Sequence, residues 1–253
     1  MPATPSSIEL AGKIALVTGA GINIGRATAL ELAAAGAMVA VNTRSSREAA
    51  ECVVNEIRDT GGRAELCMAD VADAAQVLHM VDGIIARHGR IDILVLNASV
   101  RRETRFVDMS FEQWRVPLSI SLDGSFHCIK ACLPSMIASG GGNIIALTGS
   151  NVLTGAVGKV HSSAAKSGLT GMIRALAREV GPQGIRANCV SPGIINTTRP
   201  GHRSPRRDAK GLVPLDRYGE SEEIAATVRF LCGPGGSYIT GQTVHVNGGQ
   251  TMF

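Results

Sequence analysis

The sequence predicts a single-domain α/β fold, in which one doubly wound parallel sheet of about seven strands carries helices on both faces. Short β-branched runs alternate with longer segments whose apolar residues recur every three or four positions. Several of the short runs are apolar almost throughout, which is typical of strands covered on both faces. No linker or internal repeat interrupts this alternation, so we expect one domain over residues 1–253.

Each strand in this prediction is a short apolar run. In chain order, the predicted strands are 13–18, 38–42, 63–69, 91–97, 143–148, 185–191 and 242–246. The segments 25–36 and 46–62 have helical spacing of apolar residues and end in glycine, which predicts helices with C-terminal caps. Strand–helix–strand units joined by right-handed crossovers give a parallel sheet.

Two longer helices are expected in the second half, over 111–138 and 159–181. Ser110 with Gln113 makes a capping box at the start of the first, and Pro117 is expected to kink that helix near its beginning. The second carries an apolar stripe at helical spacing, which a core-facing helix requires.

Composition excludes several classes of protein. The chain is 45% hydrophobic and 18% charged, as in a compact globular domain. The N-terminal stretch MPATPSSIEL lacks the pattern of a targeting peptide, and no run of about 20 apolar residues is present, so we expect a cytoplasmic protein without a membrane anchor. The formal charge of +4 and the eight aromatic residues argue against a nucleic-acid partner.

The six cysteines show no C-x-x-C pair and no metal-ligand spacing with histidines, so we expect buried thiols and no metal site. Cys128 and Cys132 lie one helical turn apart. Packing on an apolar helix face is favoured over metal binding for this pair.

The stretch TGAGINIG, Thr18 to Gly25, follows the first predicted strand and enters a helix. Glycines 19, 21 and 25 would let the backbone turn sharply and approach a phosphate, while the helix N-terminus offers unpaired amides to the anion. A tight strand-to-helix turn without a ligand is the alternative. The position after the first strand of an alternating pattern favours dinucleotide binding beyond the carboxyl ends of the strands.

From residue 9 to the C-terminus the chain resembles the short-chain dehydrogenase/reductase family, and TGAGINIG is similar to its T-G-x-x-x-G-x-G motif. Asn23 replaces the middle glycine, and asparagine tolerates the left-handed region better than most residues. The resemblance implies a Rossmann-type fold. It also implies a set of cofactor-binding residues: Gly19, Gly21, Asn23, Ile24, Gly25, Asp70, Val71, Asn97, Ala98, Lys166, Pro192, Gly193, Ile195 and Thr197.

The end of the second strand bears on which dinucleotide binds. An acid there would hold the ribose 2′-hydroxyl of NAD, but this chain has Thr43, Arg44, Ser45 and Ser46. NADP(H) is therefore favoured and NAD(H) stays possible. Two observations oppose this preference: Arg44 can be a solvated loop arginine, and Ile22 stands where many NADP-using relatives have a basic residue.

The family's catalytic set is an asparagine, a serine, a tyrosine and a lysine, and the resemblance places its lysine at Lys166. Four residues earlier, where the tyrosine belongs, stands Ser162. Ser150 matches the serine, with Gly149 or Asn151 as alternatives because the interval to residue 162 is one shorter than expected. Ser121 stands at the asparagine position.

A serine hydroxyl is too weak an acid to replace tyrosine. His161 is the candidate proton relay, and the opposing interpretations are a first-turn histidine without a catalytic role and a Ser162 that caps the helix. Dienoyl-CoA reductases also lack this tyrosine, and VHSSAAK is similar to their version. The similarity is partial, because Asn151 and Asp123 occupy the positions of their alternative tyrosine and asparagine.

The substrate prediction depends on basic residues. A substrate lid is expected near 197–215, and the clusters on either side of the cleft are Arg101, Arg102, Arg105, Arg199, Arg203, Arg206, Arg207 and Lys210. They favour a small anionic substrate such as a carboxylate or an acyl-CoA, although solvated loop charge explains them equally well. In many relatives, helices matching 111–138 and 159–181 form subunit contacts, so the resemblance implies a homotetramer.

Two functional hypotheses follow. The first is an NADP(H)-dependent oxidoreductase that transfers a hydride to or from a keto or enoyl substrate with a non-standard proton donor. The second is a protein that binds NADP(H) without turnover and acts as a sensor or assembly partner. Retention of Lys166 and Ser150 beside a largely intact cofactor motif favours the enzyme.

Overall fold

The computed structural model describes residues 8–198 and 210–252, and these form one α/β domain around a seven-stranded sheet. All strand pairs are parallel and their order is β3-β2-β1-β4-β5-β6-β7. The strands are β1 Ile14–Val17, β2 Met38–Thr43, β3 Arg63–Met68, β4 Ile93–Leu96, β5 Gly142–Leu147, β6 Ile185–Pro192 and β7 Thr243–Val246. The predicted doubly wound fold is confirmed, and each strand lies where the sequence predicts it.

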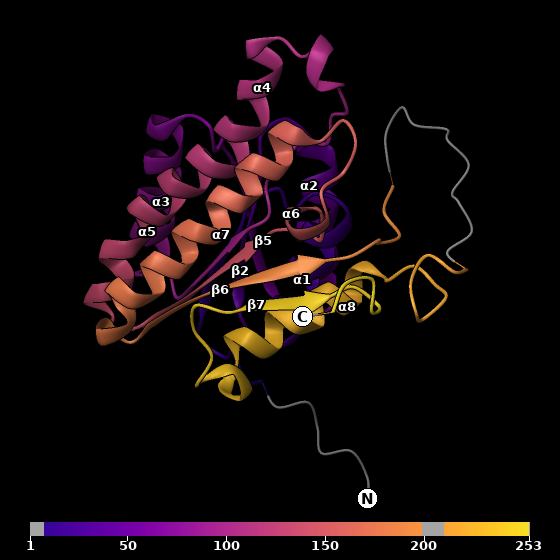
Figure 1. Cartoon of the computed structure of the whole chain (residues 1–253). Coiled ribbons are helices and arrows are strands. Elements are labelled where there is room, and N and C mark those ends of the chain that lie inside the picture. The colour runs from indigo at the N-terminus through magenta and orange to yellow at the C-terminus, as the bar shows by residue number, and fades with distance from the viewer. Residues whose placement is uncertain (1–7, 199–209, 253) are drawn as a thin grey trace, which may run out of the picture.

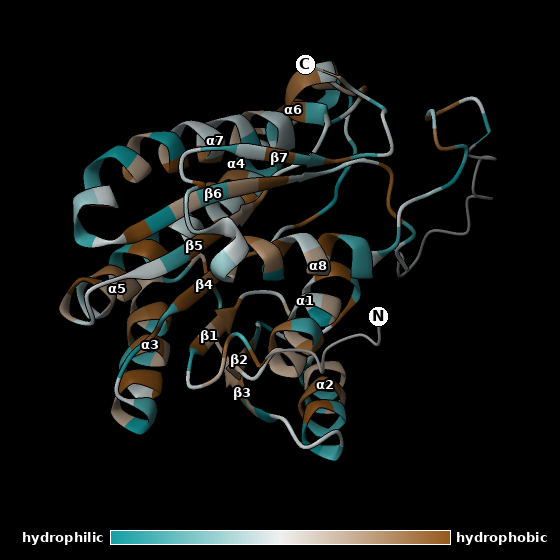
Figure 2. Cartoon of the chain, turned by 90° about the horizontal axis from the view of Figure 1, so that it is seen from below, coloured by the Kyte–Doolittle hydropathy of each residue, from teal (hydrophilic) through white to brown (hydrophobic). Residues whose placement is uncertain are grey.

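Helices cover both faces of the sheet (Figures 1 and 2). On one face lie α1 Asn23–Ala34, α2 Arg47–Asp59 and α8 Ser221–Cys232; on the other lie α3 Ala74–His88, α5 Gly124–Ala138 and α7 Val160–Val180. Shorter elements are η1 Phe106–Asp108, α4 Phe111–Leu118, η2 Ser119–Asp123, α6 Asn151–Thr154, η3 Gly181–Gln183 and η4 Pro234–Gly236. Within residues 8–198 and 210–252, no helix is both long and apolar enough to cross a membrane.

The sheet separates two hydrophobic clusters, because alternate residues of a strand point to opposite faces. Leu16 of β1 packs with the α3, α5 and α7 side, whereas its neighbour Val17 packs with the α1, α2 and α8 side. All four residues of β1 and all four of β4 are buried. This two-sided burial explains why the strands are continuous apolar runs.

Helix ends agree with the predicted caps. Gly36 and Gly61 follow α1 and α2 with φ of +98° and +82°, the left-handed region in which glycine carries no Cβ penalty. Ser110 and Gln113 form both hydrogen bonds of the capping box that begins α4. The helix predicted over 111–138 is confirmed as one continuous helical stretch, in which the π-helical turn η2 joins α4 to α5. Pro117, which lacks an amide for a helical hydrogen bond, lies two residues before that turn.

The prediction of buried thiols is confirmed for five cysteines and wrong for Cys52, which lies on the exposed face of α2. Cys128 and Cys132 are fully buried in the apolar face of α5. Burial raises the pKa of the Cys128 thiol to about 12, so this thiol stays protonated at neutral pH. Among the described residues, no group of three potential ligands could hold a metal ion.

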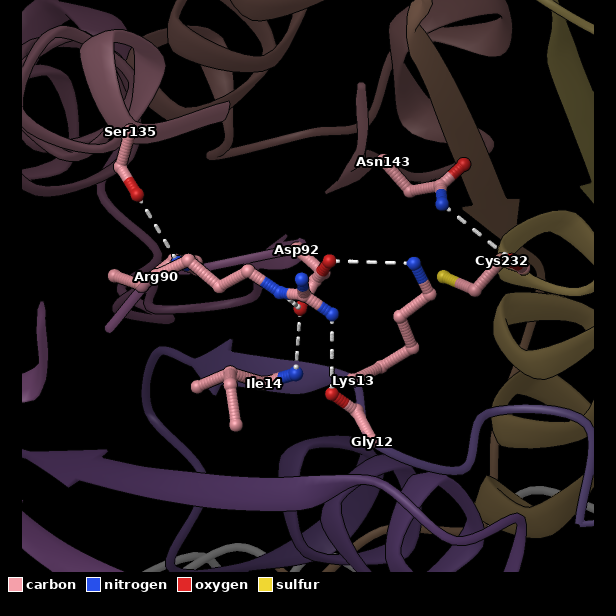
Figure 3. A network of polar contacts seen from close by, with 9 residues as sticks. Gly12, Lys13, Ile14, Arg90, Asp92, Ser135, Asn143 and Cys232 are labelled. Carbon is pink, nitrogen blue, oxygen red and sulfur yellow. Dashed lines mark hydrogen bonds and ion pairs between the residues drawn. The ribbon is translucent and has the colours of Figure 1, made fainter. Parts of the chain in front are cut away.

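A polar network stabilises the end of the sheet at which the central strands β1 and β4 begin (Figure 3). The carboxylate of Asp92, only 4% exposed, accepts hydrogen bonds from the Ile14 amide at 2.9 Å and the Arg90 Nε at 3.0 Å. Lys13 Nζ lies 3.3 Å from its other oxygen. The buried charge is thus compensated by two cations and a backbone donor, which a desolvated carboxylate requires.

Candidate functional site

A cleft opens at the carboxyl ends of the strands, where β1 and β4 are neighbours and the strand order reverses direction. Ligands bind at such switch points in open parallel sheets. Most of the lining comes from the segments that follow β4, β5 and β6 and from the first turns of α7. It comprises Ile24, Asn97, Ser99, Val100, Arg101, Arg102, Ser121, Leu147, Thr148, Gly149, Ser150, Asn151, Val152, Lys159, Ser162, Ser163, Lys166, Pro192, Gly193, Ile194, Ile195 and Gln250.

The glycine turn after β1 is held against the end of β4. The Asn97 side chain donates to the carbonyls of Thr18 at 3.0 Å and Gly19 at 2.9 Å, and Thr18 Oγ1 accepts from the Asn97 and Ala98 amides. A Cβ on Gly25 would overlap the Gly19 carbonyl oxygen and the Asn97 amide, so only glycine fits there. This packing fixes the start of α1 beneath the turn, which is the arrangement a pyrophosphate needs.

Asn23, which replaces the motif's middle glycine, adopts φ of +52°. The prediction that asparagine sustains this left-handed turn is confirmed. Its side chain also has a structural role: Oδ1 accepts from the Thr198 amide and hydroxyl, each at 2.9 Å, and Nδ2 donates to the Thr198 carbonyl at 3.1 Å. Asn23 therefore joins the glycine turn to the segment that follows β6.

The residues expected at the adenosine end of a dinucleotide come together after β2 and β3. Arg44 Nη1 lies 3.6 Å from Asp70 Oδ2, and Val71 is buried next to it. Thr43 is only 7% exposed, whereas Arg44 and Ser45 face solvent. Asn42, which sequence reasoning missed, donates to the Cys67 and Ala69 carbonyls and accepts from the Gly19 amide at 3.4 Å. A polar residue directly after the apolar run 38–41 of β2 was the available signal.

The structure brings Ser121, Ser150, Ser162 and Lys166 into the one cleft. Ser121 lies in η2, the π-helical turn beyond Pro117, and Ser150 follows β5 with its amide bonded to the Pro192 carbonyl at 3.0 Å. Gly149 and Asn151, the alternatives to Ser150, line the same cleft. All three candidates for the catalytic serine position therefore face the same cleft. Ser150 alone of the three carries a hydroxyl.

Lys166 reaches the end of β5 from α7, and its ammonium donates a hydrogen bond to the Leu147 carbonyl. Burial lowers the pKa of Lys166 to about 8, and nearby Arg101 acts in the same direction while Cys189 opposes it. An unperturbed lysine would titrate near 10.5. Lys166 is therefore an ammonium that can exchange its proton close to neutral pH.

Ser162 lines the cleft, but its Oγ donates to the Lys159 carbonyl at 3.1 Å. The helix begins after Lys159, so the interpretation of Ser162 as the helix cap is wrong. His161 points elsewhere: its side chain is fully buried, it is absent from the cleft lining, and Nδ1 accepts from the Ser162 amide at 2.9 Å. This placement gives His161 no direct path to a substrate in the cleft.

Two basic residues that follow β4 line the cleft. Arg101 Nη1 donates to Thr197 Oγ1 at 3.0 Å, across 96 positions of the chain, and Arg102 lies beside it. Lys159, which was not among the candidates, lines the cleft as well and pairs with Glu103 at 3.3 Å. The basic positions Arg199, Arg203, Arg206 and Arg207 lie outside the described residues, as does most of the predicted lid.

The fold and the site together define a protein of the dinucleotide-binding class, with a glycine turn at the switch point and a lysine-bearing helix beside it. A family model described as enoyl-(acyl carrier protein) reductase matches residues 19–251. The chain belongs to this family, within the short-chain dehydrogenases/reductases.

Individual relatives agree with this assignment. The chain is 40% identical over 245 residues to a 3-oxoacyl-[acyl-carrier-protein] reductase of Synechocystis sp., covering 96% of this chain and 99% of that protein. It is similar to a blue fluorescent protein from a metagenomic library solved with NADPH, with TM-score 0.90, 36% identity and coverage of 96% and 100%. A Burkholderia cenocepacia short-chain dehydrogenase solved with NADP gives TM-score 0.90, 33% identity and coverage of 96% and 99%.

Proposed function

We propose that this protein is an NADP(H)-dependent oxidoreductase that transfers a hydride to or from the carbonyl or enoyl group of a small substrate. The observation that carries the proposal is the convergence of Ser121, Ser150 and Lys166 on one cleft, beside a glycine turn shaped for a pyrophosphate. Solved relatives bound to NADPH and NADP support the cofactor. A 40% identical 3-oxoacyl-[acyl-carrier-protein] reductase supports a 3-oxoacyl thioester as the first substrate to test.

The chain's own residues have distinct roles in this proposal. The glycine turn and the first amides of α1 hold the pyrophosphate, and Arg44 holds the 2′-phosphate. Lys166 and Asn97 would hold the nicotinamide end, and Pro192 and Gly193 line the same cleft. Ser150 steadies the substrate oxygen as charge develops on it. The reduced nicotinamide supplies the hydride when bound.

The cations of the cleft support an anionic substrate. Arg101, Arg102, Lys159 and Lys166 line it, and its described lining contains no carboxylate side chain. Such a field attracts the phosphates or carboxylates of an acyl carrier or a keto acid. Replacement of Arg102 by alanine should raise KM for a 3-oxoacyl-CoA while kcat for a small neutral ketone stays unchanged.

Assembly into a homo-oligomer, with a tetramer as the form the family resemblance implies, is also proposed. Phe126 and Ile137 are 49% and 45% exposed and lie three helical turns apart on the outward face of α5. Lys130 lies over the Phe126 ring. A second copy packing on this face would remove its apolar surface from water.

Fluorescence titration with NADPH and NADH, followed by assay of reduced-cofactor oxidation with acetoacetyl-CoA, ketones, enoyl-CoAs and keto acids, tests the proposal. We expect tighter binding of NADPH and its oxidation by at least one carbonyl compound. Tight NADPH binding without oxidation of any compound would instead indicate the non-catalytic sensor. Failure to bind either cofactor would refute both.

A further inference from the structure

The cleft contains few groups that can supply a proton. Reduction of a carbonyl consumes one hydride and one proton, and the proton must reach the oxygen as negative charge forms on it. Among the described lining residues, the ionisable side chains are Arg101, Arg102, Lys159 and Lys166, with no tyrosine, histidine, cysteine or carboxylate. The chain's two tyrosines, Tyr218 and Tyr238, do not line this cleft.

Three of these four cations are poorly suited to the task. An arginine guanidinium keeps its proton at every pH an enzyme meets, which excludes Arg101 and Arg102. Lys159 precedes α7 and is neutralised by Glu103 at 3.3 Å. That ion pair holds the Lys159 ammonium beside Glu103.

The serines cannot replace a tyrosine either. Their hydroxyls are far weaker acids than a phenol. Ser162, at the tyrosine position, already commits its proton to the Lys159 carbonyl at 3.1 Å. The Ser162 oxygen can still accept a hydrogen bond, but its proton is used in the bond to the Lys159 carbonyl. With a serine at the tyrosine position, Lys166 is the ionisable side chain that α7 contributes to the described lining of the cleft.

The position of Lys166 suits direct transfer. Ser162 and Lys166 are four residues apart, so they share one face of α7, and both line the cleft. One N–H of the ammonium is bound to the Leu147 carbonyl, which anchors the side chain at the end of β5. An ammonium has two further N–H groups. The small Ser162 side chain stands in the cleft where the family has a phenol ring.

The charged groups around Lys166 favour release of this proton. Desolvation and the positive charge of Arg101, from the segment after β4, lower its pKa to about 8, whereas the Cys189 thiol on β6 acts in the opposite direction. Burial raises the pKa of Cys189 to about 11, so that group stays neutral near pH 7. Arg102 and Lys159, the other cations of the cleft, add positive charge.

We propose that Lys166 is itself the general acid of this enzyme, and that its ammonium protonates the substrate oxygen directly. The inference rests on the proposed function. The carbonyl carbon takes the hydride from the reduced nicotinamide, the C=O π electrons move to oxygen, and oxygen takes a proton from Nζ. The neutral amine left behind recovers its proton from solvent, so the step needs no further reactant.

Replacement of Lys166 by arginine separates this role from cofactor binding. Arginine keeps a positive charge and hydrogen-bond donors but does not release a proton. With acetoacetyl-CoA, or whichever carbonyl compound the wild type reduces, we expect NADPH affinity within a few-fold and turnover reduced on the order of 100-fold. Introduction of Ser162→Tyr into Lys166→Arg should restore about tenfold or more of the lost rate, because a phenol can then donate.

Chemical rescue provides a readout that a structural role would not produce. In Lys166→Ala saturated with NADPH, added alkylammonium ions of similar size should restore turnover, and the rescued rate should depend on the acidity of the ammonium. Turnover of Lys166→Arg within about threefold of the wild type, or rescue that follows amine size alone, would overturn the inference. An NADPH-binding wild type that reduces no carbonyl compound would instead refute the proposed function, and this inference with it.

Discussion

Asn23 and Thr198 lie 175 positions apart and are joined by three hydrogen bonds, so one side chain links the cofactor turn to the segment after β6. The same asparagine occupies a left-handed backbone conformation in which most residues are strained. Substitution of a motif glycine has therefore kept the turn and added a contact that glycine cannot make.

This arrangement predicts different effects for two substitutions at the same position. Asn23→Gly removes the three hydrogen bonds and keeps the backbone, whereas Asn23→Ala removes them and adds a left-handed penalty of about 1 kcal/mol. We expect the free energy of unfolding to fall in both and to fall further in the alanine variant. Equilibrium urea unfolding would measure it, with Thr198→Val as the partner that removes only the hydroxyl bond; equal losses in the two Asn23 variants would contradict the strain.

Cofactor selection is expected to depend on Arg44. Arg44→Ala should weaken NADPH binding by about tenfold, because a charge-assisted hydrogen bond to the 2′-phosphate is lost, and leave NADH binding within about twofold. The measurement is fluorescence titration with both cofactors. Arg87→Ala on α3, which breaks an ion pair with Glu65 of β3, is the control. Equal affinities of wild type and Arg44→Ala for NADPH would identify Arg44 as a solvated loop residue.

Asp92 is expected to contribute strongly to stability. Removal of its carboxylate in Asp92→Ala leaves the Ile14 amide without its acceptor. It also leaves the positive charges of Lys13 and Arg90 without the carboxylate that both contact. Because the Lys13 and Arg90 side chains are nearly half exposed, the main loss is the unpaired buried amide, which costs about 1–3 kcal/mol. Thermal and denaturant unfolding would measure the loss. Asp108→Ala, at an exposed 4.0 Å ion pair with Arg105, should cost less than about 0.5 kcal/mol.

Lys166 is expected to lower stability near neutral pH, as residues at functional sites often do. Because its pKa falls from 10.5 unfolded to about 8 folded, the unfolded state binds more protons between these values. The contribution of Lys166 to the free energy of unfolding therefore rises with pH between about 8 and 10.5. Below about pH 8, burial of the charged lysine lowers the free energy of unfolding by at most about 3 kcal/mol. Lys166→Met should unfold at a higher temperature than the wild type at pH 7. That advantage should shrink as the pH approaches 10.5, and a constant difference would contradict the pKa shift.

The outward face of α5 is expected to be a subunit contact. Phe126→Asp would place a charge in that contact, so sedimentation should show a smaller assembly than for the wild type. Leu78→Asp, on the equally exposed face of α3, is the control and should leave the mass unchanged. A wild type that sediments as a monomer would contradict the proposed oligomer.

The sequence alone determined the fold class and the positions of all seven strands, because continuous apolar runs and helical spacing are local patterns that burial on two faces imposes. It also identified the glycine turn and the cluster of Ser150, Ser162 and Lys166 by motif. It predicted the helical stretch over 111–138 as well, but not the π-helical turn Ser119–Asp123 within it. The exposure of Cys52 depended on which face of α2 meets the sheet.

Only the tertiary structure decided which side chains share the cleft. His161 and Ser162 are neighbours in sequence, yet one is fully buried and the other lines the cleft, because successive residues of a helix point about 100° apart. Arg101 meets Thr197, and Asn23 meets Thr198, across long stretches of chain that the parallel sheet brings to one edge. The depressed pKa of Lys166 has the same origin, since burial and the charge of Arg101 arise only when distant segments pack together.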